Sequence, residues 1–160
     1  MKKILQAEPN TEPESVMLKF GTEDTKRPLS IDDMRDRMED MKIATVDDDF
    51  VIQELVKTTF EQVGAQVDAY QDGEGFLNQV GNREYDLVFL DLLMPKVDGF
   101  KVLQELKARD IHLPIIVLSA VTQRESVIRA FQAGVKSYLI KPLKPLEILK
   151  KTMEVVRPNM

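Results

Sequence analysis

The chain contains no cysteine, and no part of its sequence is apolar over the length of a membrane span. Without cysteine it forms neither disulfide bonds nor thiolate metal sites, and a reducing compartment is expected. A spanning helix needs about 20 mainly apolar residues. The charged start Met1–Leu5 runs directly into Gln6–Pro9, so a signal-peptide core is absent there. We therefore expect a cytoplasmic protein without membrane contact.

Basic residues are fewer than acidic ones, and the net charge of the 160 residues is −5. A broad nucleic-acid-binding surface needs a positive field over the phosphates, so we expect no nucleic-acid partner. Apolar residues make up 43% of the sequence, which is enough for a sizeable core. The length suits one domain with a short appendage.

The front of the sequence differs in composition from the rest. Residues 1–29 are rich in proline and acidic residues and are predicted to be a mostly disordered tail. Their one apolar cluster, Val16–Phe20, is either a docking motif or a set of collapsed apolar residues. Residues 30–40 are predicted to form a short amphipathic helix with Ser30 as its N-cap and an apolar stripe. The stripe consists of Ile31, Met34, Met38 and Met41. The helix either packs on the main domain or pairs with a second copy.

From residue 41 onward, short apolar runs alternate with helical patterns. The expected strands are 42–46, 66–70, 85–90, 114–118 and 136–140, and the expected helices lie near 49–63, 73–80, 98–108, 122–133 and 145–156. Five strand–helix units joined by short loops predict an α/β fold with a doubly wound, five-stranded parallel sheet. The strand order 2-1-3-4-5 is favoured. It places the first and third strands side by side.

Four of these strands run into charged or hydroxyl residues, namely Asp47 and Asp48, Asp91, Ser119 and Lys141. In a parallel sheet the carboxyl ends of the strands meet at one edge, where ligands bind. Three carboxylates at one place repel one another unless a cation neutralises them. Mg²⁺ prefers oxygen ligands, so the sequence predicts a Mg²⁺ site. Asp91 would then be a nucleophile that accepts a phosphoryl group, which Ser119 and Lys141 would hold.

The motifs that carry these residues resemble the receiver domain of two-component response regulators. They are Val46-Asp47-Asp48-Asp49, Leu90-Asp91-Leu92-Leu93-Met94-Pro95 with Asp98-Gly99, Leu118-Ser119-Ala120, Ala133-Gly134 and Tyr138-Leu139-Ile140-Lys141-Pro142. Five motifs occur in the family's order, and the resemblance covers residues 41–157. The chain is similar to single-domain, CheY-like receivers, although its N-terminal extension departs from them.

The resemblance implies a flavodoxin-like fold and transfer of a phosphoryl group from a histidine kinase to Asp91. It implies Mg²⁺ bound by Asp48, by Asp91, by the backbone carbonyl of Leu93 and, largely through water, by Asp47. Ser119 and Lys141 are implied as ligands of the phosphoryl group. Ser119 and Tyr138 are implied to move on activation, and the Lys141-Pro142 peptide bond is implied to be cis.

The resemblance also bears on output and catalysis. The resemblance implies that this chain signals by contact with a downstream protein, whose identity the sequence does not give. The contact face would be formed by the helix near 122–133, the strand 136–140 and the helix near 145–156. The protein would be a monomer or a phosphorylation-dependent dimer. It would be no conventional enzyme, although it would catalyse its own phosphorylation and, slowly, its own dephosphorylation. Whether the chain is a piece of a longer protein stays open.

Three other functions compete with the phosphorylation switch. The chain could be a phosphorylation-independent interaction module, a phosphorelay intermediate that passes the phosphoryl group on, or a metal-dependent phosphatase with an aspartyl nucleophile. Such a phosphatase is expected to place a second acid two residues after the nucleophile, where this sequence has Leu93. His112 lies in a loop between a helix and a strand, and we expect it to be a surface residue away from the site.

Overall fold

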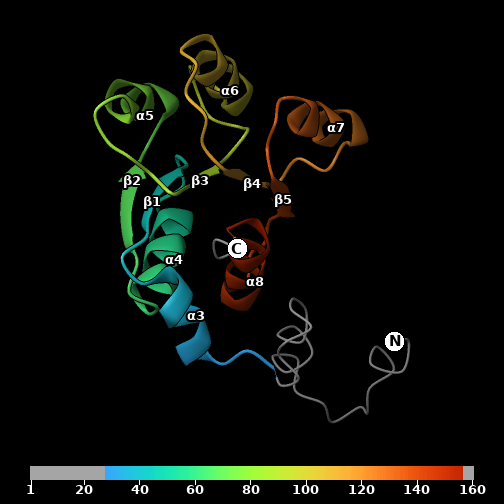
Figure 1. Cartoon of the computed structure of the whole chain (residues 1–160). Coiled ribbons are helices and arrows are strands. Elements are labelled where there is room, and N and C mark those ends of the chain that lie inside the picture. Colours follow the sequence, from blue (N-terminus) through green and yellow to red (C-terminus); the bar gives the residue numbers. More distant parts are fainter. Residues whose placement is uncertain (1–27, 157–160) are drawn as a thin grey trace.

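The computed structural model describes residues 28–156, in which helices and strands alternate after a first helix (Figure 1). The elements are α3 (Ile31–Met38), β1 (Lys42–Val46), α4 (Phe50–Glu61), β2 (Gln66–Tyr70), α5 (Gly73–Val80), β3 (Leu87–Leu90), α6 (Gly99–Ala108), β4 (Ile115–Ser119), α7 (Arg124–Gln132), β5 (Ser137–Ile140) and α8 (Pro145–Val155). The predicted tail, with its apolar cluster Val16–Phe20, lies outside the described residues.

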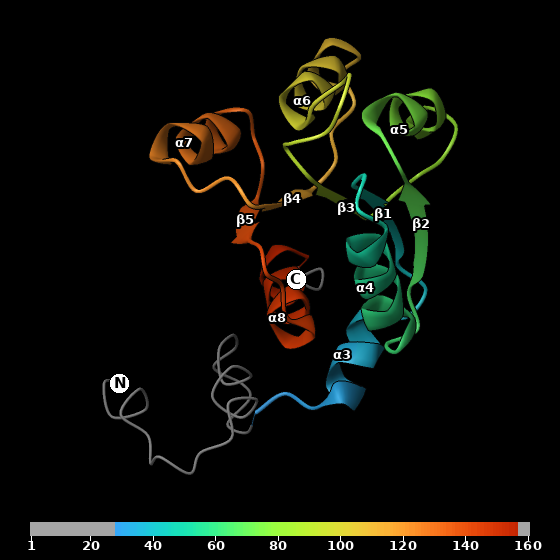
Figure 2. The same ribbon diagram turned by 180° about the vertical axis from the view of Figure 1, so that it is seen from behind.

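The five strands form one parallel sheet in the order β2-β1-β3-β4-β5. This confirms the predicted doubly wound, flavodoxin-like fold. Helices α5, α6 and α7 cover one face of the sheet, and α4 and α8 cover the other, with α3 below α4 (Figures 1 and 2). The order reverses between β1 and β3, so their carboxyl ends meet at the point where such sheets bind ligands.

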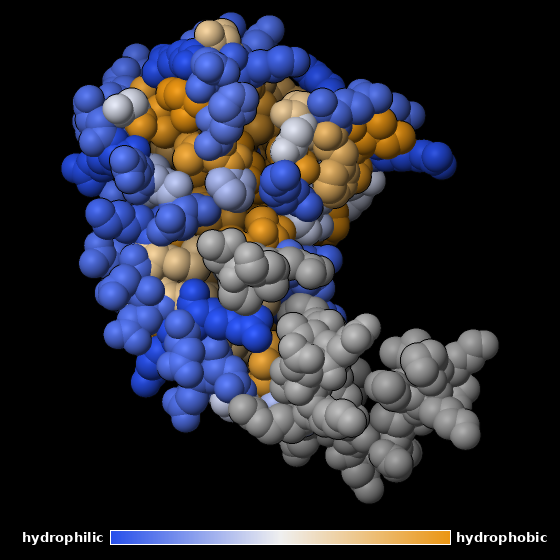
Figure 3. Space-filling model, viewed as in Figure 1, coloured by the Kyte–Doolittle hydropathy of each residue, from blue (hydrophilic) through white to orange (hydrophobic). Residues whose placement is uncertain are grey.

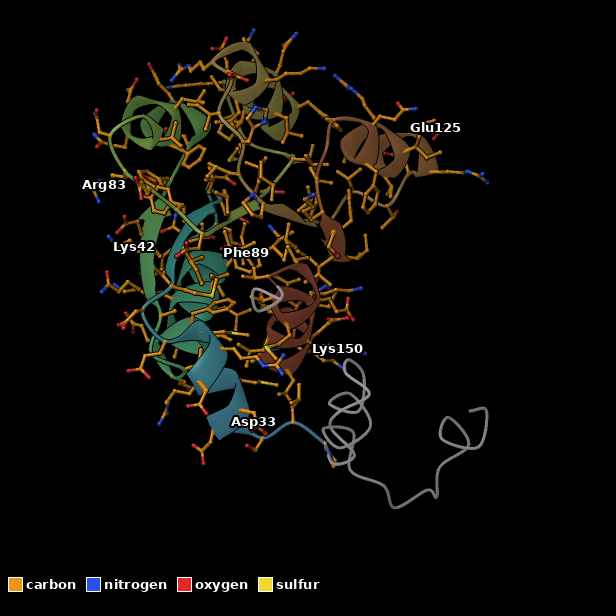
Figure 4. The ribbon with its side chains drawn as sticks, in the orientation of Figure 1. Asp33, Lys42, Arg83, Phe89, Glu125 and Lys150 are labelled. Carbon is orange, nitrogen blue, oxygen red and sulfur yellow. The ribbon has the colours of Figure 1, made fainter. Side chains whose placement is uncertain are left out.

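Alternate side chains of the central strands feed two separate cores. In β3, Leu87 and Phe89 belong to the core under α4 and α8, whereas Val88 and Leu90 belong to the core under α5 and α6. Successive side chains of a strand point to opposite faces, and helices cover both faces. Continuous apolar runs therefore form the inner strands. Figure 4 shows Phe89 at the centre of the molecule.

Three of the five strands have slightly different boundaries from those predicted. The third strand begins at Leu87 rather than at residue 85, the fourth covers Ile115–Ser119 rather than 114–118, and the fifth begins at Ser137 rather than at residue 136. Asp86 lies just before β3, where its carboxylate accepts a hydrogen bond from the Lys42 backbone N–H at 2.8 Å. Ser119 remains in the ladder because its carbonyl accepts a hydrogen bond from the Lys141 N–H at 2.9 Å. The backbone of Ser119 is therefore held in place by the sheet itself.

Helix α3 packs on the main domain. Of the two predicted alternatives, packing on the domain and pairing with a second copy, the structure shows the first. Ser30 and Asp33 form a capping box at its start. Met34 and Met38 are fully buried in the core shared with α4 and α8. Leu29, which the sequence assigned to the tail, is only 7% exposed in the same core, whereas Ile31 of the expected apolar stripe is 43% exposed. The domain core therefore includes at least one residue, Leu29, that the sequence assigned to the tail.

Helix α7 is the least buried of the helices around the sheet, with Ala130 as its one buried residue. Ile128 and Phe131 are more than 40% exposed, and Ile140 on the neighbouring edge strand β5 is 40% exposed. Figure 3 shows apolar residues gathered at the surface around this helix, between hydrophilic rims. The side chain of Glu125 lies on its outer side (Figure 4). This part of the molecule therefore presents an apolar surface next to the sheet edge.

Candidate functional site

The acidic residues predicted to converge do lie together at the carboxyl edge of the sheet. Asp47 follows β1 and Asp91 follows β3, and the two strands are paired so that Val46 lies beside Leu90. The Asp91 backbone N–H donates to the Val46 carbonyl at 3.0 Å, which extends the pairing to the site. One carboxylate oxygen each from Asp47, Asp48 and Asp91 lies within 4.8 Å of the others. The site is thus a direct product of the strand order.

The three carboxylates differ in their surroundings. Asp47 is 1% exposed and Asp91 is 5% exposed, whereas Asp48 is exposed. One oxygen of Asp47 accepts a hydrogen bond from the Asp49 backbone N–H at 2.9 Å. The Asp91 Oδ1 accepts a longer one from the Leu93 N–H at 3.3 Å. The cluster therefore has two recessed members fixed by the backbone and one member at the surface.

Lys141, which follows the edge strand β5, contributes a positive charge to the cluster. Its Nζ lies 2.9 Å from Asp47 Oδ2 and 3.5 Å from Asp91 Oδ2. Lys141 directly follows β5, and the peptide bond to Pro142 is cis, as the family resemblance implied. The lysine side chain is 19% exposed. It therefore supplies a largely buried positive charge between two carboxylates that come from different strands.

Burial and charge shift the ionisation of these groups. Burial raises the pKa of Asp91, and the neighbouring charge of Asp47 raises it further, while Lys141 lowers it in part. Burial also raises the pKa of Asp47, against the hydrogen bond from Lys141. Burial alone would lower the pKa of Lys141, but its hydrogen bond and attraction to Asp47 leave that pKa raised. Burial is therefore the main reason why ionisation of the two recessed carboxylates is disfavoured, and Lys141 offsets it only in part.

Ser119 and Tyr138 form a second group around Val121. Ser119 is fully buried, and its Oγ accepts a hydrogen bond from the Val121 backbone N–H at 3.1 Å. The hydroxyl of the half-buried Tyr138 donates to the Val121 carbonyl at 2.7 Å. Burial raises the pKa of Tyr138, so its hydroxyl stays protonated and can donate. Both predicted switch residues thus hold the same peptide segment between β4 and α7.

The loop after Asp91 depends on a glycine whose role the sequence did not reveal. A Cβ added at Gly99 would lie 2.5 Å from the Asp91 carbonyl oxygen and 2.7 Å from the Leu92 Cα. Real Cβ atoms do not approach this closely, so any other residue would displace the backbone of the phosphoacceptor candidate. The Gly99 N–H also donates to the Leu92 carbonyl at 3.0 Å. The Asp98-Gly99 pair was the available signal, since glycine marks close backbone approaches.

Two further predicted residues lie as follows. The side chain of Leu93 is at the surface beside the site, with the residue 60% exposed. His112 lies outside the site, as expected: its imidazole is exposed and lies 2.8 Å from the Asp110 carboxylate. His112 is therefore not part of the acidic cluster.

The acidic cluster suits a hard divalent cation. Its donors are carboxylate oxygens, which Mg²⁺ prefers, and Mg²⁺ commonly takes one or two carboxylates with several waters. Asp48 and Asp91 would hold it, together with the Leu93 carbonyl, while both oxygens of Asp47 already accept hydrogen bonds. Three carboxylates face a single lysine there, so the cluster carries an excess of negative charge. A bound cation would relieve that excess.

Comparison with known proteins decides the family. A family model described as the response regulator receiver domain matches residues 43–153. The chain belongs to the response regulator receiver family. Receiver domains of this kind are phosphorylation-dependent switches in two-component systems, they interact with histidine kinases, and they generally bind Mg²⁺ through acidic residues. Helix α3 precedes the matched region.

Curated relatives of this receiver domain are transcriptional regulators. The transcriptional regulatory protein RprY of Bacteroides fragilis is 32% identical over 124 residues, which cover 78% of this chain and 52% of RprY. The DNA-binding dual master transcriptional regulator RpaA of Synechocystis is 35% identical over 118 residues, covering 72% of this chain and 49% of RpaA. The chain thus spans about half the length of the curated relatives it matches.

Solved receiver structures resemble the fold along almost their whole length. The BeF3-activated DrrB receiver domain has a TM-score of 0.67 at 30% identity, covering 74% of this chain and 99% of DrrB. The chemotaxis protein CheY4 of Vibrio cholerae has a TM-score of 0.68 at 26% identity, covering 72% and 98%. A CheY from Borrelia burgdorferi, solved with CheX, BeF3 and Mg²⁺, has a TM-score of 0.68 at 26% identity, covering 76% and 97%.

None of the helices within residues 28–156 is long and apolar enough to cross a membrane. The cytoplasmic location expected from the sequence stays a prediction.

Proposed function

We propose that this receiver domain is a switch that accepts a phosphoryl group on Asp91 from a phosphohistidine of a histidine kinase. The observation that supports this most strongly is the placement of Lys141, whose Nζ lies 3.5 Å from Asp91 and 2.9 Å from Asp47. Lys141 is already beside the carboxylate on which additional negative charge would accumulate. The other carboxylates leave room for a divalent cation at the same place.

The transfer exchanges one bond to phosphorus for another. An oxygen of the Asp91 carboxylate attacks phosphorus, an acyl phosphate forms, and the phosphorus–nitrogen bond breaks with its electron pair left on the donor imidazole. Mg²⁺, when bound, neutralises charge on the phosphoryl oxygens. Lys141 adds a positive charge on another side, and Ser119 offers a hydroxyl group. Phosphoryl transfer depends mainly on such alignment and charge neutralisation rather than on covalent help from the protein.

Ser119 and Tyr138 would pass the change to the surface. Ser119 now accepts a hydrogen bond from the Val121 N–H, and Tyr138 donates to the Val121 carbonyl. If Ser119 turns to a phosphoryl oxygen, the Val121 segment loses one of these two bonds and can move with Tyr138. The segment leads into α7, in which Ile128 and Phe131 are exposed. We infer that α7, β5 and α8 form the surface that contacts the downstream protein.

The direct test is mass spectrometry of the protein after incubation with a small phosphodonor and Mg²⁺. A single added phosphoryl group that accumulates supports the switch. The absence of any adduct would instead support a phosphorylation-independent interaction module. Release of phosphate without accumulation would support a phosphatase, and fast transfer onward to a histidine protein would support a relay intermediate. The absence of a nucleic-acid partner stays a prediction about this chain alone, because its transcriptional relatives are about twice as long as the matched region.

Mg²⁺ should stabilise the folded protein, because it binds the carboxylate cluster only when the cluster is assembled. At ten times its Kd the expected gain in unfolding free energy is about 1.4 kcal/mol. Asp48→Ala should lose most of this gain, whereas Asp36→Ala, which removes an exposed carboxylate from α3, should retain it. The measurement is the melting temperature with and without Mg²⁺. A melting temperature of the unmodified protein that does not respond to Mg²⁺ would count against the metal site.

The phosphorylated form should decay slowly. In the family, the residues two after the acceptor and two after the Ser/Thr flank the approach of the hydrolytic water. Here they are the 60% exposed Leu93 and the half-buried Val121, and neither side chain can position water by a hydrogen bond. Leu93→Asn should accelerate the decay about tenfold or more, measured after removal of the phosphodonor. Ile31→Asn, at an exposed apolar residue of α3, is the matched control. Decay within seconds in the unmodified protein would refute the idea.

A further inference from the structure

Of the three carboxylates in the acidic cluster, Asp48 is the one whose side chain is exposed. An exposed carboxylate keeps most of its rotamer freedom, so its position at the site depends on where the backbone places its Cα. The peptide group before Asp48 begins with the Asp47 carbonyl. This carbonyl accepts a hydrogen bond from the side-chain amide of Gln53 at 2.7 Å.

Gln53 is well supported for this contact. It lies in the first turns of α4, which begins at Phe50 after the N-cap Asp49. The Asp49 side chain accepts from the Val51 N–H at 2.9 Å, and the Asp49 carbonyl accepts from the Gln53 N–H at 3.1 Å. The helix start is therefore rigid, and the half-buried Gln53 side chain reaches back from it to the acidic loop.

The Gln53 amide contacts a different group of Asp47 from the other hydrogen bonds at this residue. The bond from the Asp49 N–H and the bond from Lys141 both hold the Asp47 side chain. On the main chain, the Asp47 N–H donates to the Tyr70 carbonyl at 3.1 Å. Gln53 instead holds the Asp47 carbonyl, and thereby the plane of the peptide that leads to Asp48. An amide suits this position because it donates a hydrogen bond without bringing a positive charge near a cation site. Sites held by such supporting contacts bind with less reorganisation.

We propose that Gln53 is a positioning residue for Mg²⁺ binding: its amide fixes the Asp47–Asp48 peptide, and so presents the Asp48 carboxylate to the cation. The inference rests on the proposed Mg²⁺-dependent function. It assigns to Gln53 no contact with the cation or with the phosphoryl group. Its effect should therefore appear in the affinity for Mg²⁺ before any effect on stability.

The test compares Mg²⁺ binding by calorimetric titration in the full chain and in three variants. Gln53→Met keeps the length of the side chain but cannot donate, so the Kd for Mg²⁺ should rise about three- to tenfold, as for loss of one hydrogen bond. Gln104→Met, the same change at an exposed position of α6, should leave the Kd unchanged. Gln53→Lys retains a donor of similar reach. It should bind Mg²⁺ more tightly than Gln53→Met, although its charge alone would predict the opposite.

Melting temperatures without Mg²⁺ separate positioning from a purely structural role. Gln53→Met should melt within about 2 °C of the unmodified protein. A lowered melting temperature with an unchanged Kd would overturn the proposal, as would equal Mg²⁺ affinity in Gln53→Met and the unmodified protein. Weaker binding by Gln53→Lys than by Gln53→Met would overturn it too. An unmodified protein that does not bind Mg²⁺ would overturn the metal site itself, and Gln53 positioning with it.

Discussion

The Asp91→Asn protein is expected to acquire no phosphoryl group from a small phosphodonor and Mg²⁺, while folding more stably than the unmodified protein in the absence of Mg²⁺. The amide keeps the shape of the side chain but is not a nucleophile. The stability gain follows from the raised pKa of Asp91, caused by burial and by the charge of Asp47. A carboxyl group whose pKa is higher in the folded state lowers stability at every pH above its unfolded value, because its charged form is disfavoured by folding.

Two measurements check this prediction. Mass spectrometry should show no adduct on Asp91→Asn and one on Asp110→Asn, a control that changes a solvent-exposed carboxylate. Melting curves without Mg²⁺ should show an advantage of Asp91→Asn near neutral pH that shrinks as the pH falls and Asp91 becomes protonated in the unmodified protein. A phosphoryl adduct on Asp91→Asn would refute the assignment of the acceptor. An unchanged or lower melting temperature near neutral pH would refute the electrostatic account.

Helix α3 should contribute several kcal/mol to the stability of the domain, although it lies outside the region that defines the family. Met34 is fully buried in the core shared with α4 and α8. Met34→Ala should lower the unfolding free energy by about 2–5 kcal/mol, the usual range for truncating a buried methionine. Ile31→Ala, on the same helix but 43% exposed, should cost less than about 1 kcal/mol. Denaturant unfolding measures both.

Truncation provides an independent check on α3. A chain that begins at Pro28 keeps Leu29, Met34 and Met38 in the core and should unfold cooperatively like the full chain. A chain that begins at Met41 loses all three and uncovers the ends of α4 and α8. It also loses the bond from the Arg35 guanidinium to the Gln62 carbonyl at 2.7 Å. Equal stability of the two truncated chains would show that α3 is only loosely attached.

Some features of the site were predictable because they depend on short stretches of sequence. Apolar runs that end in Asp47 and Asp91 indicate strand ends, and right-handed crossovers between short units leave few possible sheet orders. The order 2-1-3-4-5 then brings these two residues together, as observed. The cis bond before Pro142 accompanies a recognisable motif. These predictions succeeded because strand ends are local and the topology has few alternatives.

Other features were decided by contacts between side chains and backbone groups that no sequence pattern encodes. Nothing in the local pattern around Gln53 shows that its amide reaches the Asp47 carbonyl, and the tight approach of Gly99 to the Asp91 carbonyl appears only when the loop is closed. The burial of Leu29 depends on the surfaces of α4 and α8.

The sequence by itself therefore determined the fold family, the strand order and the identity of the charged residues at the carboxyl edge of the sheet. Only the tertiary structure decided which supporting side chains hold that edge in place, and where the N-terminal helix docks. The physical reason is that periodicity encodes which face of an element is buried, whereas a hydrogen bond or a close approach between elements depends on their relative positions to within a fraction of an ångström.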